Sequence, residues 1–278
     1  MNNYFFTQIV FCTGLAAGLL GALTGLGGGV VLVPVLTLLF GIDIRYAIGA
    51  SLISVIATSS GAGAAYVKEG YTNIRIGMFL EIATTLGALA GAFLAGLVSP
   101  SSIAVIFGMF LLHSVYMSTS RSHQLLPPTQ PDPLATRLRM NGNYPTDEGP
   151  RQYYVTGVPA GTGLMFVAGS LSGLLGIGSG AVKVLAMDRA MRIPFKVSTT
   201  TSNFMIGVTA AASAGVYLSR GYIDPGLAMP VMLGVLVGSL VGARILPKAR
   251  TDYLRRIFSV VILLMALEMI YKGIWGKM

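Results

Sequence analysis

The stretch GLLGALTGLGGGVVLVP, from Gly18 to Pro34, places three consecutive glycines inside an apolar run. That run extends from Phe5 to Phe40, and as one straight helix it would be roughly 54 Å long at about 1.5 Å per residue. The hydrocarbon layer of a membrane is only about 30 Å thick. Because consecutive glycines weaken a helix, we predict a helix, a break at Gly27 to Gly29 and a second, shorter helix.

The composition indicates a membrane protein. The 278 residues are 54% hydrophobic and only 10% charged, whereas soluble domains are about 25% charged. The apolar runs do not alternate with polar residues as the strands of a membrane barrel do. We therefore predict an all-α, polytopic protein whose apolar runs are Phe5 to Phe40, Ala47 to Val67, Ile76 to Val98, Ile103 to Ser118, Tyr153 to Met187, Val197 to Leu218, Leu227 to Leu246 and Arg256 to Trp275.

The charged and sulfur-containing residues exclude several other classes. The formal net charge of +9 comes from lysines and arginines scattered over short connections, which is typical of membrane-side residues, so no nucleic-acid partner is expected. Cys12 is the only cysteine, which excludes an internal disulfide and a cysteine metal site. No metal or cofactor is expected. The N-terminal MNNYFFTQIV has no basic region, so a cleaved signal peptide is not expected.

The two halves of the chain align without a gap at an offset of 151 positions. LTGLGGGVV, Leu23 to Val31, falls on LLGIGSGAV, Leu174 to Val182. Two homologous membrane repeats are therefore predicted, at residues 1–118 and 153–278, each opening with a glycine-broken helix. Further matched pairs are Ile42 with Ile193, Arg45 with Lys196, Ser51 with Ser202, Tyr66 with Tyr217, Gly70 with Gly221, Tyr71 with Tyr222, Gly87 with Gly238 and Gly91 with Gly242.

The segment between the repeats, residues 119–152, is predicted to be an extramembrane linker. The stretch from Ser118 to Gln152 is polar and holds six of the 13 prolines. Within it, Asp132 is placed as the N-cap of a short helix whose first residue is Pro133. Both a helix on the membrane surface and an ordinary loop fit this pattern.

The distribution of positive charge favours a chain that turns back at each break. If each broken segment crosses the membrane once, the lysines and arginines near the membrane divide almost evenly between the two sides. If it turns back, Arg45, Arg220, Lys272 and Lys277 lie on one side and thirteen others on the opposite side. The positive-inside rule prefers the second arrangement. It predicts a cytoplasmic linker, both termini outside and two repeats of inverted orientation.

The glycines resemble a nucleotide-binding loop only superficially. A dinucleotide site needs a preceding strand and a soluble unit, and although Asp43 lies at a suitable distance, the flanking residues form apolar helix. No Gly-Lys-Ser/Thr follows, which excludes a phosphate-binding P-loop. An intramembrane serine protease would pair Ser179 with His113, but nothing in the sequence directs one toward the other.

Two roles remain open for the glycines. Small residues four apart allow helices in a membrane to approach closely, and this role is predicted for Gly87, Gly91, Gly234, Gly238 and Gly242. A break within the membrane instead frees backbone N–H groups, which are tolerated only against protein or a watery cavity. The start of the following helix also carries partial positive charge, so two such breaks could face one anion.

Four stretches together resemble the sulfite exporter TauE/SafE family of membrane permeases: GLLGALTGLGGGVVLVPVL, GSLSGLLGIGSGAVKVLAM, AIGASLISV and VSTTTSNFMIG. The resemblance covers the whole chain apart from the linker. It implies transport of sulfur-containing anions such as sulfite, sulfoacetate and other organosulfonates. The chain departs from the family pattern at Ser179, within the usual glycine run, and at Leu185, where a proline like Pro34 is common.

The candidate site combines the breaks with polar residues of the next span. Lys183 follows the second break and is a candidate counter-charge, although its side chain could instead reach the membrane surface. Glu81 could carry a coupling proton, lie at the membrane interface or form a structural ion pair. Glu268 and Lys272 are spaced as a simple helical pair. Hydroxyl groups could donate to sulfonate oxygens or simply bond to their own helix. The predicted substrate-binding residues are Gly27, Gly28, Gly29, Ser51, Ser54, Gly178, Ser179, Gly180, Lys183, Thr201, Ser202 and Asn203.

These observations predict a multi-pass permease of a bacterial inner membrane rather than an enzyme. Its partners would be the lipid bilayer and a small anion, and the glycine faces leave room for a homo-oligomer. A channel-like anion pore and an intramembrane enzyme remain alternatives. The sequence leaves the particular anion, the direction of transport and the coupling ion open.

Overall fold

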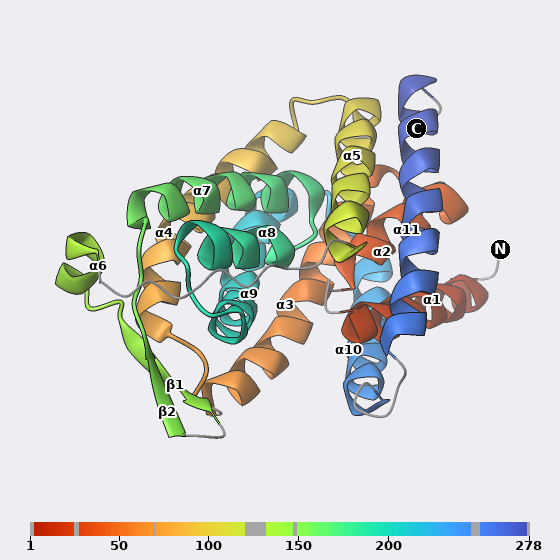
Figure 1. Ribbon diagram of the computed structural model, residues 1–278. Coiled ribbons are helices and arrows are strands. Elements are labelled where there is room, and N and C mark those ends of the chain that lie inside the picture. The colour runs from red at the N-terminus through yellow and green to blue at the C-terminus, as the bar shows by residue number, and fades with distance from the viewer. Residues whose placement is uncertain are drawn as a thin grey trace.

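The computed structural model describes residues 3–24, 28–68, 70–119, 132–146, 149–245 and 251–276, and within them the chain is mostly helical (Figure 1). Only one pair of strands occurs in these ranges, in the linker. The elements are α1 (Asn3–Thr24), α2 (Gly29–Phe40), α3 (Ile44–Lys68), α4 (Ile74–Ala95), α5 (Pro100–Thr119), α6 (Pro133–Arg137), β1 (Gly142–Thr146), β2 (Gly149–Tyr153), α7 (Val158–Leu175), α8 (Gly180–Leu185), the π-helix η1 (Ala186–Ala190), α9 (Phe195–Ser219), α10 (Pro225–Ile245) and α11 (Thr251–Ile274).

The predicted apolar runs Phe5 to Phe40 and Tyr153 to Met187 both contain broken helices, and both turn back. The first is interrupted between α1 and α2, although Gly27 itself lies outside the described residues. The ring of Phe40, at the end of α2, lies 6.5 Å from the ring of Phe6, near the start of α1. In the second run, the Thr156 amide before α7 donates to the Met191 carbonyl after η1 at 3.1 Å. Each run therefore ends at the level where it began.

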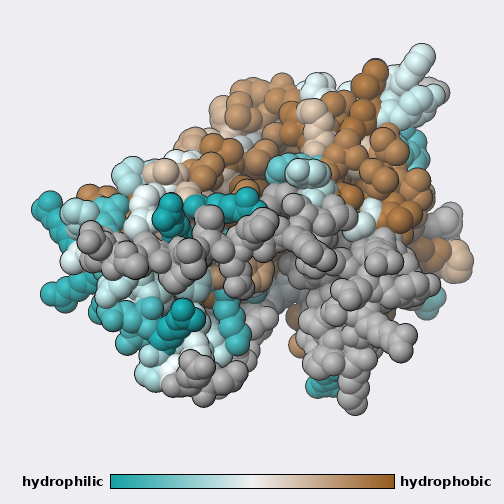
Figure 2. Space-filling view, viewed as in Figure 1, coloured by the Kyte–Doolittle hydropathy of each residue, from teal (hydrophilic) through white to brown (hydrophobic). Residues whose placement is uncertain are grey.

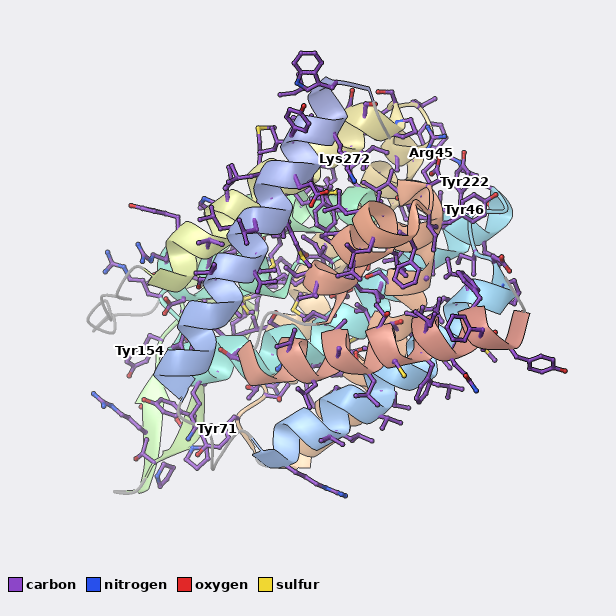
Figure 3. All side chains as sticks on the ribbon, turned by 90° about the vertical axis from the view of Figure 1, so that its right-hand side faces the viewer. Arg45, Tyr46, Tyr71, Tyr154, Tyr222 and Lys272 are labelled. Carbon is purple, nitrogen blue, oxygen red and sulfur yellow. The ribbon has the colours of Figure 1, made fainter. Side chains whose placement is uncertain are left out.

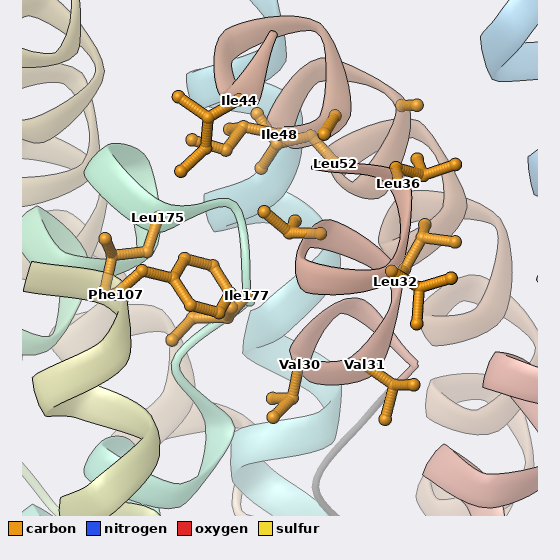
Figure 4. Packing of buried hydrophobic residues seen from close by; sticks show 14 of the residues in the cluster. Val30, Val31, Leu32, Leu36, Ile44, Ile48, Leu52, Phe107, Leu175 and Ile177 are labelled. Carbon is orange, nitrogen blue, oxygen red and sulfur yellow. The ribbon is translucent and has the colours of Figure 1, made fainter. Parts of the chain in front are cut away.

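The other helices pack around a central pair, α3 and α9 (Figure 1). Helix α10 packs on α3 and α4 on α9, while α1 covers α10 and α7 covers α4. Helices α5 and α11 form a further pair. The largest apolar core draws on both halves of the chain: Ile177 of the second break lies in it with Leu32 of α2, Ile48 of α3 and Phe107 of α5 (Figure 4).

Four helices are long and apolar enough to cross a membrane within the described ranges, namely α1, α4, α7 and α10. Shorter apolar stretches occur in α2, α3 and α5. Apolar side chains are exposed on the outer surface, and Figure 2 shows them gathered over α5 and α11, whereas hydrophilic residues gather over α6 and the β-hairpin. An outer surface of this kind is expected of a protein whose solvent is lipid.

Glycines let the outer helices approach backbone to backbone. A methyl group at Gly91 of α4 would overlap the carbonyl oxygen of Ser170 in α7, and one at Gly238 of α10 would overlap that of Leu15 in α1. A methyl group at Gly87 would likewise overlap the carbonyl oxygen of Phe166, and one at Gly234 would overlap that of Phe11. The predicted packing role of these four glycines is confirmed.

The linker forms a small folded unit on the ends of several helices. Asp132 caps α6 by accepting from the Leu134 amide at 2.9 Å, as predicted. The antiparallel hairpin β1–β2 was not predicted, and Tyr153, taken as the start of a membrane span, instead ends β2. Asn73, before α4, anchors the unit by donating to the Met140 carbonyl at 3.0 Å and to the Tyr153 hydroxyl at 2.7 Å.

The glycine contacts predict an unequal effect of two similar substitutions. Gly91→Ala should destabilise the protein by about 1–3 kcal/mol, because the added methyl must push α4 away from α7. Gly215→Ala on exposed α9 surface is the matched control, since no atom lies within 4 Å of the position of its methyl group. Thermal unfolding in detergent should separate the two variants, and equal melting temperatures would contradict this account of the packing.

Candidate functional site

The start of α2 and the second helix break meet at the centre of the described chain. The Ser51 hydroxyl of α3 donates to the Gly176 carbonyl, the first residue of the second break, at 2.7 Å. A methyl on Gly29, at the start of α2, would lie 3.1 Å from the same carbonyl oxygen. The second break continues between the central helices, because Gly178 faces Val55 of α3 and Ile206 of α9. Backbone that leaves the helical ladder is thus covered by protein on all these sides.

The second break has a more strained backbone than its glycines alone require. Gly176 and Gly178 have φ angles of 67° and 70°, which glycine adopts freely, but Ser179 also has a positive φ, of 45°. The Ser179 hydroxyl is buried, and no described group bonds to it. After this break α8 ends at Leu185 and continues as the π-helix η1, whereas α2 is a regular helix through Pro34.

Lys183 is the most unusual side chain of the site. It lies one turn after Ser179, and its side chain is completely buried. Its ammonium group donates to the hydroxyl of Thr209 in α9, and its Nζ lies 3.9 Å from the Glu81 carboxylate of α4. The alternative in which Lys183 reaches the membrane surface is wrong, because the side chain points into the protein.

Glu81 completes a buried polar cluster with Lys183 and Thr209. Its carboxylate accepts hydrogen bonds from Thr209 at 2.7 Å, from Thr84 at 3.0 Å and from Thr85 at 3.2 Å. Of the three predicted alternatives, placement at the membrane interface does not fit this burial; Glu81 forms an ion pair with Lys183, and a coupling role stays a prediction. Opposite charges so placed offset part of the large cost of burying either one.

The predicted hydroxyl residues divide into two groups. Ser202 lies beside the second break, where its hydroxyl donates to the Gly180 carbonyl at 3.2 Å. Ser54 bonds to the Ala50 carbonyl of its own helix at 2.9 Å, and Thr201 accepts from the Asn73 amide at 3.1 Å. Asn203 is half-buried on α9. Thus Ser51 and Ser202 lie against the second break, whereas Ser54 bonds within its own helix and Thr201 bonds to the residue before α4.

The structure brings one unpredicted residue into the site and removes one predicted partner. Thr209 lies on α9 two turns after Ser202, so the same face that carries Ser202 could have indicated it. His113 is exposed on α5 and does not bond to Ser179, which leaves the serine protease interpretation without its base. Outside the site, Glu268 and Lys272 form the predicted helical pair at 3.1 Å.

At each end of the central pair α3 and α9, a positively charged side chain packs on a tyrosine ring. At the start of α3, Arg45 lies over the ring of Tyr222, 5.4 Å from its centroid, and Figure 3 shows the two side by side with Tyr46. At the opposite end, Lys196 of α9 lies 4.2 Å from the ring centroid of Tyr71. Cation–π contacts of this kind are worth about 0.5–1 kcal/mol at exposed sites. The central helices are thus held together at both ends.

A shallow groove of about 470 Å³ lies on the outer surface between α1 and α10. Phe11, Met229 and Leu233 line it with other mostly apolar residues. Because it faces outward and has no charged lining, it suits lipid chains better than an anion. The groove is therefore separate from the cluster around Lys183.

Comparison with known proteins agrees with this membrane architecture. The pattern of the sulfite exporter TauE/SafE family matches residues 10–269. The chain is 31% identical over 275 residues to the probable membrane transporter protein YunE of Bacillus subtilis, covering 96% of this chain and 98% of that protein. It is 26% identical to a probable membrane transporter protein of Methanocaldococcus jannaschii, covering 94% of each. No solved structure matches.

The matches extend over nearly the whole chain, and the bacterial relatives and apolar helices indicate a multi-pass protein of the cell membrane. The first-named relative is of essentially the same length, so the match does not rest on a shared fragment. The chain belongs to the sulfite exporter TauE/SafE family of membrane transporters.

Proposed function

We propose that the protein transports sulfur-containing anions such as sulfite, sulfoacetate or another organosulfonate, and that the anion binds beside the second helix break at Lys183. The observation that carries the proposal is a completely buried ammonium group at the meeting point of α4, α8 and α9. A buried cation within a membrane protein is costly and generally serves transport or catalysis.

The surroundings of Lys183 suit an oxyanion. Its ammonium group has three N–H donors, and one of them is engaged by the Thr209 hydroxyl. The Glu81 carboxylate, at 3.9 Å, is beyond hydrogen-bond distance. One turn earlier, the Ser179 hydroxyl is buried without a partner, and Ser202 lies across from Gly180. Sulfonate and sulfite oxygens would accept from these donors.

A two-repeat architecture is part of the proposal. Helix α3 begins and ends 151 residues before α9, which is the offset of the sequence alignment. Contacts recur at the same offset: Arg45 on Tyr222 corresponds to Lys196 on Tyr71. The contact of Gly18 with Val235 corresponds likewise to that of Gly169 with Thr84. Such recurrence supports two structurally equivalent repeats, residues 1–118 and 153–278.

The packing of α5 against α11 supports an inverted orientation. Gly273, near the end of α11, contacts Ser101 at the start of α5, whereas Gly108 contacts Ala266. The two helices therefore run antiparallel. Because they are equivalent under the 151-residue offset, the axis that relates them is perpendicular to both, which for membrane-crossing helices means in the plane of the membrane.

A comparison of the two halves of the chain supports a functional role for the charged pair of Lys183 and Glu81. At the offset of 151, Lys183 corresponds to Leu32 of α2, and Glu81 corresponds to Met232 of α10. Leu32 is completely buried in the apolar core. Apolar residues therefore stand at both aligned positions, and one of them is fully buried. This difference supports a functional role for the charged pair.

The two halves suggest a double substitution as a test. Lys183→Leu with Glu81→Met copies the residues of the equivalent position, and because buried ion pairs can often be replaced by apolar residues, we expect the variant to fold with normal or higher stability. Uptake of labelled sulfite and methanesulfonate into proteoliposomes should be abolished. Glu268→Gln, which alters the exposed pair with Lys272, is the control and should transport normally.

The form of the uptake separates the alternatives. Saturable uptake by the wild type that the double substitution abolishes is the expected result for a carrier. Flux that rises linearly with substrate would indicate a pore, and recovery of chemically altered substrate would indicate an enzyme. Normal saturable uptake by the double variant would show that Lys183 does not bind the anion.

The inverted topology can be tested by accessibility labelling. The exposed Cys12 is first replaced by alanine, and single cysteines are introduced as Asn143→Cys in β1 and Ser219→Cys at the end of α9. With an impermeant maleimide, Asn143→Cys should react only from the cytoplasmic side and Ser219→Cys only from outside, since positive charge accumulates at the linker end. Reaction of both from one side would refute the topology.

A further inference from the structure

The hydrogen bonds around Glu81 are more numerous than an ion pair requires. Three threonine hydroxyls, from Thr84, Thr85 and Thr209, donate to its two oxygens, while the lysine lies farther away than any of them. The Glu81 side chain is 10% exposed, whereas Lys183 is not exposed at all. The carboxylate is therefore held in place independently of the lysine, and it is the more accessible of the two charges.

We propose that Glu81 binds one proton for each monovalent anion that binds at Lys183, so that the protein couples anion transport to protons; this rests on the function proposed above. In the structure, Glu81 is the counter-charge of Lys183. When the carboxylate takes up a proton it becomes a neutral acid, and the ammonium group is left without a counter-charge. An uncompensated buried charge is strongly unfavourable. The incoming anion removes that penalty, so anion binding and proton binding favour each other.

Thr209 is the positioning residue that links the two groups. Its hydroxyl accepts a hydrogen bond from Lys183 and donates one to Glu81 at 2.7 Å. The Thr209 hydroxyl has a single proton, which it donates to a Glu81 oxygen. When that oxygen carries a proton of its own, the two protons face each other and the Thr209 hydroxyl must reorient. Protonation of Glu81 therefore changes the hydrogen bond between Thr209 and the Lys183 ammonium group directly, and no helix has to move.

The other ionisable groups of the surrounding helices lie away from this cluster. Among the side chains that the structure describes on the packed elements, they are Arg75 of α4, Asp188 and Arg189 of η1, Lys196 and Tyr217 of α9 and Arg45 and Tyr46 of α3; Tyr66 and Lys68 of α3 lie outside those side chains. None of them forms a hydrogen bond or ion pair with Glu81 or Lys183, and α7 carries no ionisable side chain. Within the described chain, the charge state of the cluster is thus set by its own two groups.

Coupling can be measured with methanesulfonate, which stays a monovalent anion throughout the working pH range. An inward proton gradient should drive its accumulation in wild-type proteoliposomes by up to about tenfold for each unit of pH difference. A trapped pH indicator should record one proton entering with each anion. Glu81→Gln should exchange labelled for unlabelled methanesulfonate but lose both accumulation and proton entry, whereas Glu268→Gln should retain both. Thr209→Val should lower the proton-to-anion ratio, which a purely structural loss would leave at one.

The results separate this inference from the proposed function. Wild-type uptake of methanesulfonate without proton entry would overturn the coupling and leave the transport function standing. Accumulation by Glu81→Gln equal to that of the wild type would do the same. If Glu81→Gln does not fold, the indicator measurement on the wild type decides alone. Absence of any saturable uptake by the wild type would overturn both.

Discussion

Inside a membrane, a broken helix exposes backbone groups that no water can satisfy, and this constraint explains the centre of the structure. The second break lies against the start of α2 and between α3 and α9, where Ser51 bonds to the Gly176 carbonyl. These backbone groups can be covered by protein only if α2 and α8 turn back into the protein instead of continuing toward lipid. The outer helices then close over this centre, and their glycines permit backbone contact where larger residues would hold them apart.

The buried charged pair has no charged counterpart at the aligned positions of the sequence. At the 151-residue offset Lys183 aligns with Leu32 and Glu81 aligns with Met232, so apolar residues stand at both positions that align with the buried charged pair. Two runs of the chain are broken helices, and a cation lies on a tyrosine ring at each end of α3 and α9. Under the proposed function, the charged pair supplies selectivity for an anion at one position in the protein. We therefore assign the path of the anion to the arrangement of the helices, and the binding of the anion to the charged pair of Lys183 and Glu81.

Features governed by local chemistry could be predicted from the sequence, and features governed by contacts between distant segments could not. Consecutive glycines identified the breaks, the distribution of lysines and arginines favoured segments that turn back, and Asp132 with Pro133 marked α6. The hairpin escaped prediction because GNYPT and GPRQY are rich in glycine and proline, which strands disfavour, and its anchor Asn73 lies far away in the sequence. Likewise, helical spacing could not reveal that Glu81 pairs with Lys183, since the two lie on different helices.

The position of the anion tests the central claim most directly. Selenite is a close chemical analogue of sulfite, and the anomalous scattering of its selenium would locate it in crystals of the protein. The account predicts one strong peak within hydrogen-bond distance of the Lys183 ammonium group, on the side of Ser179 and Ser202. A peak elsewhere, for example in the groove between α1 and α10, with none beside Lys183, would contradict it.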